Sequence, residues 1–112
     1  MYAYEIPGLR FSLPAGAAVA QHRFVSVGSN SVGVQATAAT EVVGASMNEV
    51  KQDQVLEVAD GLVIVEAGAE ITAGALVYSD AEGKATTTKG TASAAGIAIT
   101  AGTAGQLVTV KM

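Results

Sequence analysis

The feature that most constrains the fold is an internal repeat with an offset of 52 residues. Ala15-Gly16-Ala17-Ala18-Val19 in the first half of the chain matches Ala67-Gly68-Ala69-Glu70-Ile71 in the second half. The same offset pairs Phe24-Val25 with Leu76-Val77, Gly44 with Gly96, Gln54 with Gln106, Val55-Leu56 with Leu107-Val108, and Val58 with Val110. A constant offset over this length predicts one supersecondary unit that is used twice.

Both units have the composition of short β-strands. Val55–Val58 and Leu107–Val110 are rich in β-branched residues, and each follows a glutamine. Leu62–Val65 is a continuous apolar run, which is typical of a strand covered on both faces. Asp60-Gly61 separates the first of these runs from Leu62–Val65, and Asp-Gly between two apolar runs predicts a hairpin turn.

Helical signals are confined to Ser46-Met47-Asn48-Glu49, which fits a capping box. The predicted fold is therefore all-β: a small β-barrel or jelly-roll-like sandwich built from two similar units, with at most a short helical turn near residues 46–54. We expect residues 1–12 to form an N-terminal arm and residues 13–112 to form a single β domain, with the internal repeat spanning 14–58 and 66–110.

The composition excludes several classes of function. Half of the residues are hydrophobic and only 14% are charged, against about 25% in typical soluble domains, so part of the surface is expected to contact another protein. The net charge of -4 argues against a nucleic-acid or anionic membrane surface. No stretch approaches the roughly 20 apolar residues of a membrane-spanning helix. The absence of cysteine excludes disulfides and thiolate metal sites.

The histidine and the paired glutamates are interpreted as turn residues. His22 is equivalent to Gly74 in the second unit, so an exposed turn position is expected in preference to a metal ligand or a pH switch. Glu66 and Glu70 flank the second Ala-Gly turn and are interpreted as solvated carboxylates, not as an acid/base pair.

Two further polar motifs also lack the residues that chemistry would need. Asp80 and Glu82 have no further oxygen ligands at the spacing of a calcium loop. Gly83-Lys84 lacks the earlier glycine and the Ser or Thr of a phosphate-binding loop. We therefore predict no catalytic, cofactor-binding or metal-binding residues, and no enzymatic activity.

Most of the aromatic residues are concentrated before the repeat, in a segment interrupted by Pro7-Gly8. The large apolar residues of this segment are Tyr2, Tyr4, Ile6, Leu9 and Phe11. They either pack on the domain's own sheet or form an arm that docks on a partner, where aromatic side chains supply large contact areas.

One protein family shares the order of motifs in this chain. The motifs are Val65–Val77, Asp80–Lys84, Ala95–Ala98 and Ala104–Val110. Their succession resembles the small tailed-phage capsid cement (decoration) proteins. The resemblance runs from about Leu13 to Met112 and is strongest after Leu62, whereas Gln21-His22-Arg23 departs from the glycine turn expected in the first unit.

The resemblance implies a structural virion protein that is made in the cytoplasm of the bacterial host. Such proteins bind the outer surface of the expanded capsid and bridge neighbouring major capsid protein subunits. The family also implies a homo-oligomer, for which we expect a trimer, with a dimer as the alternative. The residues assigned to capsid binding are those of the proposed arm: Tyr2, Tyr4, Ile6, Leu9 and Phe11.

An alternative function is a small carbohydrate- or ligand-binding β module, because the Ala-Gly turns also resemble those of SAF-type domains. A sugar platform would need aromatic side chains, and after Phe24 only Tyr78 remains. A third class, an enzyme subunit, has no residue that we can nominate for catalysis.

Overall fold

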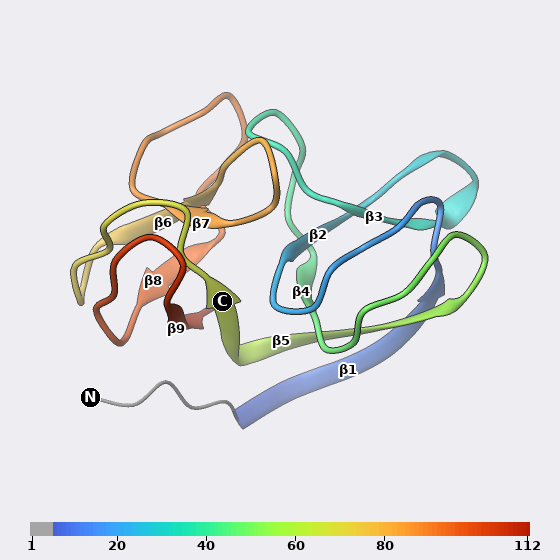
Figure 1. The fold of residues 1–112 in the computed structure, drawn as a ribbon, viewed down its shortest axis with the longest axis horizontal. Helices are drawn as coiled ribbons and strands as arrows, with labels where there is room; N and C mark the ends of the chain where they lie inside the picture. The colour runs from blue at the N-terminus through green and yellow to red at the C-terminus, as the bar shows by residue number, and fades with distance from the viewer. Residues whose placement is uncertain (1–5) are drawn as a thin grey trace.

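The computed structural model describes residues 6–112, and its regular backbone structure is almost entirely β (Figure 1). The strands are β1 (Ile6–Pro14), β2 (Phe24–Val27), β3 (Gly33–Gln35), β4 (Gly44–Ser46), β5 (Val55–Glu66), β6 (Leu76–Ser79), β7 (Ala85–Thr86), β8 (Gly96–Ala98) and β9 (Leu107–Lys111). One 3-10 turn at Ser29–Ser31 is the helical element of these described residues. The prediction of an all-β fold is confirmed.

Residues 46–54, where the sequence allows a short helical turn, contain no helix. Asn48 instead ties this loop to β5: its side-chain amide donates to the Val55 carbonyl oxygen at 3.2 Å, and its Oδ1 accepts from the Glu57 N–H at 3.0 Å. An asparagine side chain that bonds backbone groups competes with helix formation, so the capping box does not form.

The named strands all pair antiparallel in one curled sheet, with the order β3-β2-β4-β5-β9-β8-β6-β7 and with β1 paired to β5. Isolated parallel bridges from Ala15 to Gly33 and from Ala67 to Ala85 connect distant parts of this sheet. The sheet therefore curls back on itself at both ends.

The hairpin predicted at Asp60-Gly61 is wrong, because β5 runs through these residues as one strand. Its first half pairs with β1 and β4, and its second half pairs with β9. Gly61 has a φ of +95°, and β1 carries an irregularity between Pro7 and Arg10 opposite this point. The Asp-Gly pair therefore supplies a bend in a long strand, where the sequence pattern predicted a reversal of the chain.

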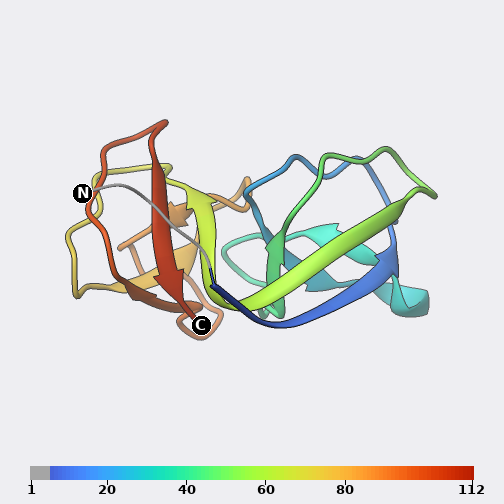
Figure 2. The same cartoon turned by 90° about the horizontal axis from the view of Figure 1, so that it is seen from below.

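The bend separates two lobes, which Figure 2 shows side by side. We define the first lobe as residues 10–59 and the second lobe as residues 62–111. Their backbone contacts recur with an offset of 52 positions: the Val19–Val50 bridge corresponds to Ile71–Gly102, and Ala15–Gly33 corresponds to Ala67–Ala85. The long strand β5 belongs to both lobes. Its first half pairs with β1 in the first lobe, and its second half pairs in the equivalent way with β9 in the second lobe.

Each lobe has an apolar interior built from equivalent positions. The equivalent buried pairs include Val25 and Val77, Leu56 and Val108, and Val58 and Val110. The side-chain volumes at two equivalent positions differ between the lobes. In the first lobe Gly33 lies beside Leu56, and a Cβ on Gly33 would be only 2.7 Å from Leu56 Cδ2. In the second lobe Ala85 replaces the smaller Gly33, and Val108 replaces the larger Leu56. Close packing in both interiors explains this exchange of volume between neighbours.

The outer face of the first lobe packs against the second lobe. Phe24 is fully buried (0% exposed) and joins the core cluster of the second lobe together with Ala45 and Ala59. The Phe24 N–H donates to the Gly83 carbonyl oxygen at 2.7 Å, and the Glu66 N–H donates to the His22 carbonyl oxygen at 2.9 Å. The two lobes are therefore joined by a continuous apolar core and by backbone hydrogen bonds.

Candidate functional site

The residues assigned to the N-terminal arm do not share one environment. Tyr2 and Tyr4 lie outside the described residues, and of Ile6 the structure describes the backbone, which pairs with Leu62. Leu9 is 58% exposed. Phe11, by contrast, is half-buried and packs against the core of the first lobe. Of the assigned residues whose side chains are described, Leu9 is therefore the one exposed to solvent, and Phe11 anchors the strand.

The exposure of Leu9 follows from the backbone irregularity in β1. The register between β1 and β5 shifts between Pro7 and Arg10, so Leu9 has no direct partner on β5. Its N–H is held by Asp60, whose Oδ1 accepts at 2.9 Å. Such bulges re-aim side chains away from the regular sheet.

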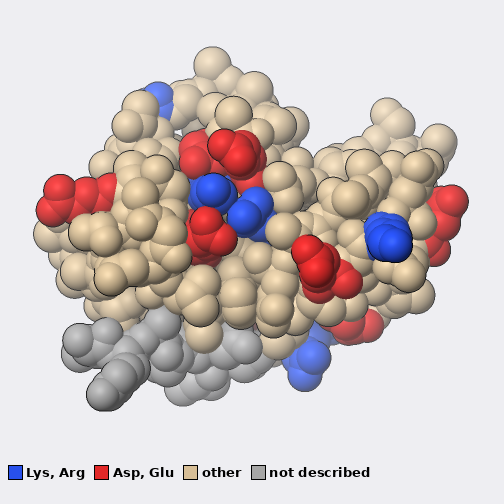
Figure 3. All heavy atoms as spheres, viewed as in Figure 1, with Lys and Arg blue, Asp and Glu red and all other residues tan. Residues whose placement is uncertain are grey.

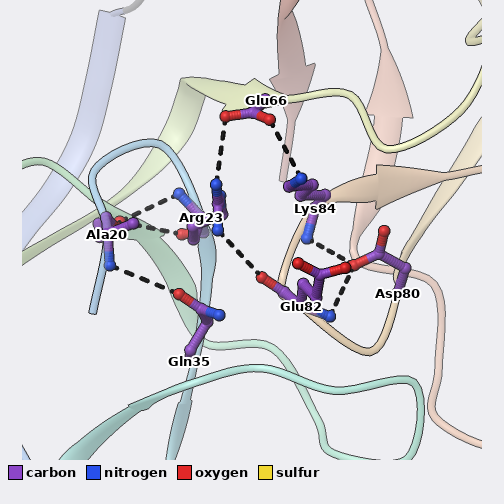
Figure 4. A network of polar contacts seen from close by, with 8 residues as sticks. Ala20, Arg23, Gln35, Glu66, Asp80, Glu82 and Lys84 are labelled. Carbon is purple, nitrogen blue, oxygen red and sulfur yellow. Dashed lines mark hydrogen bonds and ion pairs between the residues drawn. The ribbon is translucent and has the colours of Figure 1, made fainter. Parts of the chain in front are cut away.

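A cluster of charged residues connects the two lobes (Figure 4). Glu66, at the end of β5, accepts from an Arg23 guanidinium nitrogen at 3.2 Å and lies 3.3 Å from Lys84 Nζ. The space-filling view shows basic side chains flanked by acidic ones on one face, between the lobes, in a largely uncharged surface (Figure 3). The interpretation of Glu66 as a solvated turn carboxylate is wrong, because its side chain is 26% exposed and carries two ion pairs.

Two opposing effects set the pKa of the Glu66 carboxyl. Burial raises the pKa, but the hydrogen bonds and positive charges of Arg23 and Lys84 outweigh it, so the pKa lies below the ordinary value of 4.5. A carboxyl whose pKa is lower in the folded state stabilises the fold at pH values above its unfolded pKa. That contribution is lost as the pH falls through the folded pKa.

Glu66→Gln is expected to lower the free energy of unfolding by about 0.5–1 kcal/mol at pH 7, as for a partly exposed ion pair. The difference from the wild type should shrink as the pH falls through the lowered pKa of folded Glu66, where the glutamate itself becomes protonated. Urea denaturation at pH 7 and at a series of acidic pH values measures this trend, with Glu70→Gln as the control because Glu70 is exposed and outside the cluster. A loss that stays the same over the whole acidic series would contradict a charge-based role for Glu66.

Sequence reasoning missed Arg23 and Lys84, and the repeat does not single them out, because Glu49 and Lys51 also lack charged equivalents. The positions equivalent to Arg23, Glu66 and Lys84 in the other unit are Ala75, Pro14 and Val32. Each charge is thus present in one unit and absent from the other. In this cluster the three charges serve a contact that is made once in the chain, the contact between the lobes.

His22 occupies a turn with a φ of +62°, as the equivalent Gly74 does with +87°. The turn position is as predicted, but the side chain is not fully exposed. It is half-buried, and its Nδ1 is buried without a hydrogen-bond partner among the described residues. The carbonyl oxygen of His22 accepts the backbone hydrogen bond that joins the lobes, which explains why this turn is covered.

Asp80 has a structural role in its loop. Its Oδ1 accepts from the Glu82 N–H at 2.8 Å and from the Lys84 N–H at 2.9 Å, in the manner of an Asx turn. Residues 6–112 contain no group of three metal-ligating side chains. In the same range, no helix is long and apolar enough to span a membrane.

Two surface hollows are candidate ligand sites. One, of about 200 Å³, lies between the lobes and is lined by Ala38, Ser79, Asp80, Ala81, Thr86, Thr88, Lys89 and Gly90. The other, of about 360 Å³, is lined by Ala18, Glu49, Val50, Lys51 and Gln54. Neither lining includes an aromatic side chain, which a sugar platform uses for stacking.

The comparison with protein families assigns the chain to one of them. The sequence pattern of the phage cement proteins matches residues 6–112, which include all nine strands. The chain belongs to the phage cement protein family. The resemblance found in the sequence is thereby confirmed, and this cement protein is a structural protein of a phage.

A solved structure has the same fold. The chain is similar to the head fiber gp8.5 N base in bacteriophage phi29, with a TM-score of 0.77, 21% sequence identity and coverage of 91% of each chain. At this identity the likeness shows a shared fold. A comparison with curated proteins finds no match for the cement protein.

Proposed function

We propose that this cement protein binds the outer surface of the expanded phage capsid and bridges neighbouring major capsid protein subunits. The observation that carries the proposal is the family match over residues 6–112. A protein that binds the expanded lattice better than the unexpanded or dissociated one stabilises it by mass action. Many copies of a modest interface then add up over one shell.

The composition and the fold support a role in binding. The cement protein combines a rigid two-lobed β-structure with few charges and a net charge of -4, which gives no attraction to packaged DNA. The charged cluster is used between its own lobes, and the described residues offer no metal-binding group. We infer that the protein has no enzymatic activity and acts through its surfaces.

The proposed capsid contact is the N-terminal arm, with Tyr2, Tyr4, Ile6, Leu9 and Phe11. Leu9 is the arm residue best placed to reach a partner, because it is exposed on an irregular segment of β1. Phe11 would act indirectly by fixing β1 on the first lobe. We further propose that the capsid-bound form is a homotrimer, with a dimer as the alternative, on the outside of the virion after synthesis in the host cytoplasm.

Cosedimentation with phage shells that lack the cement protein tests this function. We expect saturable binding to expanded shells and no binding to unexpanded shells. Binding to neither shell would contradict the proposed function. Equal binding to both would contradict stabilisation of the expanded lattice by selective binding.

Deleting residues 2–5 and replacing Leu9 with serine is expected to weaken binding to expanded shells by at least about tenfold, as for the loss of an interfacial anchor. This change keeps Phe11 and the whole length of β1, whereas removing everything before Ser12 would also remove the Phe11 contacts with the core. The control is Val55→Ser, which alters a side chain that is 60% exposed on β5. Full binding by a folded arm variant would show that the arm does not grip the capsid.

A further inference from the structure

The two lobes of the cement protein pack head to tail within one chain. Phe24, Ala45 and Ala59 form a row across β2, β4 and β5, because Phe24 pairs with Ala45 and Ala45 pairs with Ala59. Side chains of directly paired residues project from the same face of a sheet. All three are buried in the cluster that contains the second lobe's core. The outer face of the first lobe is therefore covered by the second lobe.

The equivalent row on the second lobe is not covered by any of the residues that the structure describes. It consists of Leu76, Ile97 and Lys111, which are paired across β6, β8 and β9 in the same register. Leu76 is 53% exposed and Ile97 is 44% exposed. Adjacent exposed leucine and isoleucine side chains form an apolar patch that is typical of a protein contact. We call Leu76, Ile97 and Lys111 the open row.

The residues of the second lobe that contact the first lobe also have repeat equivalents, and these lie at one end of the first lobe. Glu66 and Gly83 of the second lobe contact the turn that holds Arg23 and Phe24, and Lys84 pairs with Glu66 beside it. Their equivalents are Pro14, Ser31 and Val32. This end carries no charge at the three positions, and Pro14 and Ser31 are exposed.

Val27 completes this end of the first lobe. Its equivalent in the second lobe is Ser79, which is buried and lines the hollow between the lobes together with Ala38. Val27 itself is 51% exposed. The large apolar side chain of Val27 is therefore exposed to solvent, at the position where the equivalent residue of the second lobe faces the first lobe. We call Pro14, Val27, Ser31 and Val32 the free end.

We propose that the open row of one copy binds the free end of a second copy, so that the chains associate head to tail. The two surfaces are the repeat equivalents of residues that lie on opposite sides of the contact between the lobes, where Phe24 binds Gly83, and both are mainly apolar. A contact between two different surfaces is heterologous, so successive copies form a ring if the rotation closes and an open chain if it does not. This inference concerns self-association and does not depend on capsid binding.

The contact between copies differs from the contact within the chain in two ways. Ala75, Pro14 and Val32 replace the charged cluster, so the association should not weaken as salt is raised. Pro14 has no N–H and cannot repeat the hydrogen bond from Glu66 to His22. We therefore expect reversible, concentration-dependent association and not a permanent dimer.

Sedimentation velocity over a range of protein concentrations tests the proposal on the free protein. The wild type should sediment faster as the concentration rises, at low and at high salt. The double variant Leu76→Ser, Ile97→Ser should raise the dissociation constant at least about tenfold. The control is Leu107→Ser: Leu107 is 43% exposed, but its equivalent Val55 is 60% exposed and so lies outside the covered face.

A mixing experiment tests that the two surfaces are different. Val27→Asp should also raise the dissociation constant at least about tenfold, although it lies in the other lobe. An equimolar mixture of Val27→Asp with the Leu76→Ser, Ile97→Ser variant should form dimers, because each variant retains one intact surface. A wild type that stays monomeric at all concentrations overturns the proposal. Unimpaired association of either folded variant, or a mixture that stays monomeric, also overturns it.

Discussion

Replacing Phe24 with alanine is expected to lower the free energy of unfolding by about 3–5 kcal/mol, the usual cost of truncating a fully buried phenylalanine. The phenyl ring is completely enclosed between the lobes, in the cluster that includes Ala45, Ala59 and the interior of the second lobe. Its removal leaves a cavity at the place where the two lobes share their core. Because a small domain is only marginally stable, this loss is a large part of its total stability.

The repeat provides a matched control for this variant. Leu76 occupies the equivalent position in the second lobe and is 53% exposed. Leu76→Ala should therefore cost less than about 1 kcal/mol, measured at a protein concentration low enough to keep the chain monomeric. Urea denaturation followed by circular dichroism compares the two variants. Equal losses would contradict the head-to-tail packing of the lobes, since that packing is what makes the two positions different.

Adding a methyl group at Gly44 or at Gly96 is expected to destabilise the fold by about 1–3 kcal/mol each, the range for overpacking. A Cβ on Gly44 would lie 2.5 Å from Val58 Cγ1 and 2.7 Å from the Ala59 carbonyl oxygen. On the equivalent Gly96 it would meet the Lys111 carbonyl oxygen and lie 2.9 Å from Val110 Cγ1. Backbone atoms of the neighbouring strand cannot move aside without disturbing the sheet.

Gly8→Ala is the control for both substitutions, because a Cβ there would be 3.4 Å from its nearest neighbour, Asp60 Oδ1. Its effect on the free energy of unfolding should stay within about 0.5 kcal/mol. Thermal and urea denaturation of the three variants give the comparison. If Gly44→Ala and Gly96→Ala are as stable as Gly8→Ala, the close approach of β4 and β8 to their partner strands is incorrect.

Strand segments such as Val55–Val58, Leu62–Val65 and Leu107–Val110 could be predicted from the sequence, but the connection at residues 60–61 could not. Local residue types indicate that Asp60-Gly61 needs an unusual backbone conformation, and Gly61 does have a positive φ. A hairpin and a bent strand both satisfy that requirement. The difference is decided by which strands flank β5 on each side of the bend, and those partners are distant in the sequence.

The charged cluster between the lobes could not be predicted from the sequence for a related reason. Glu66 alone resembles any turn carboxylate, and its partners Arg23 and Lys84 are distant along the chain. Likewise, no local property separates the buried Phe24 from the exposed Leu76. Comparing the two units position by position does not single out either feature, because charges such as Glu49 and Lys51 also lack a charged equivalent. Which of the differing residues meet between the lobes is decided by the tertiary structure.

Cryo-electron microscopy of expanded shells saturated with the purified cement protein tests the central claim most directly. The proposed function predicts added density on the outer surface, with each copy contacting at least two neighbouring major capsid protein subunits. Shells with no added density, with density inside, or with each copy seated on a single subunit would contradict a bridging cement protein.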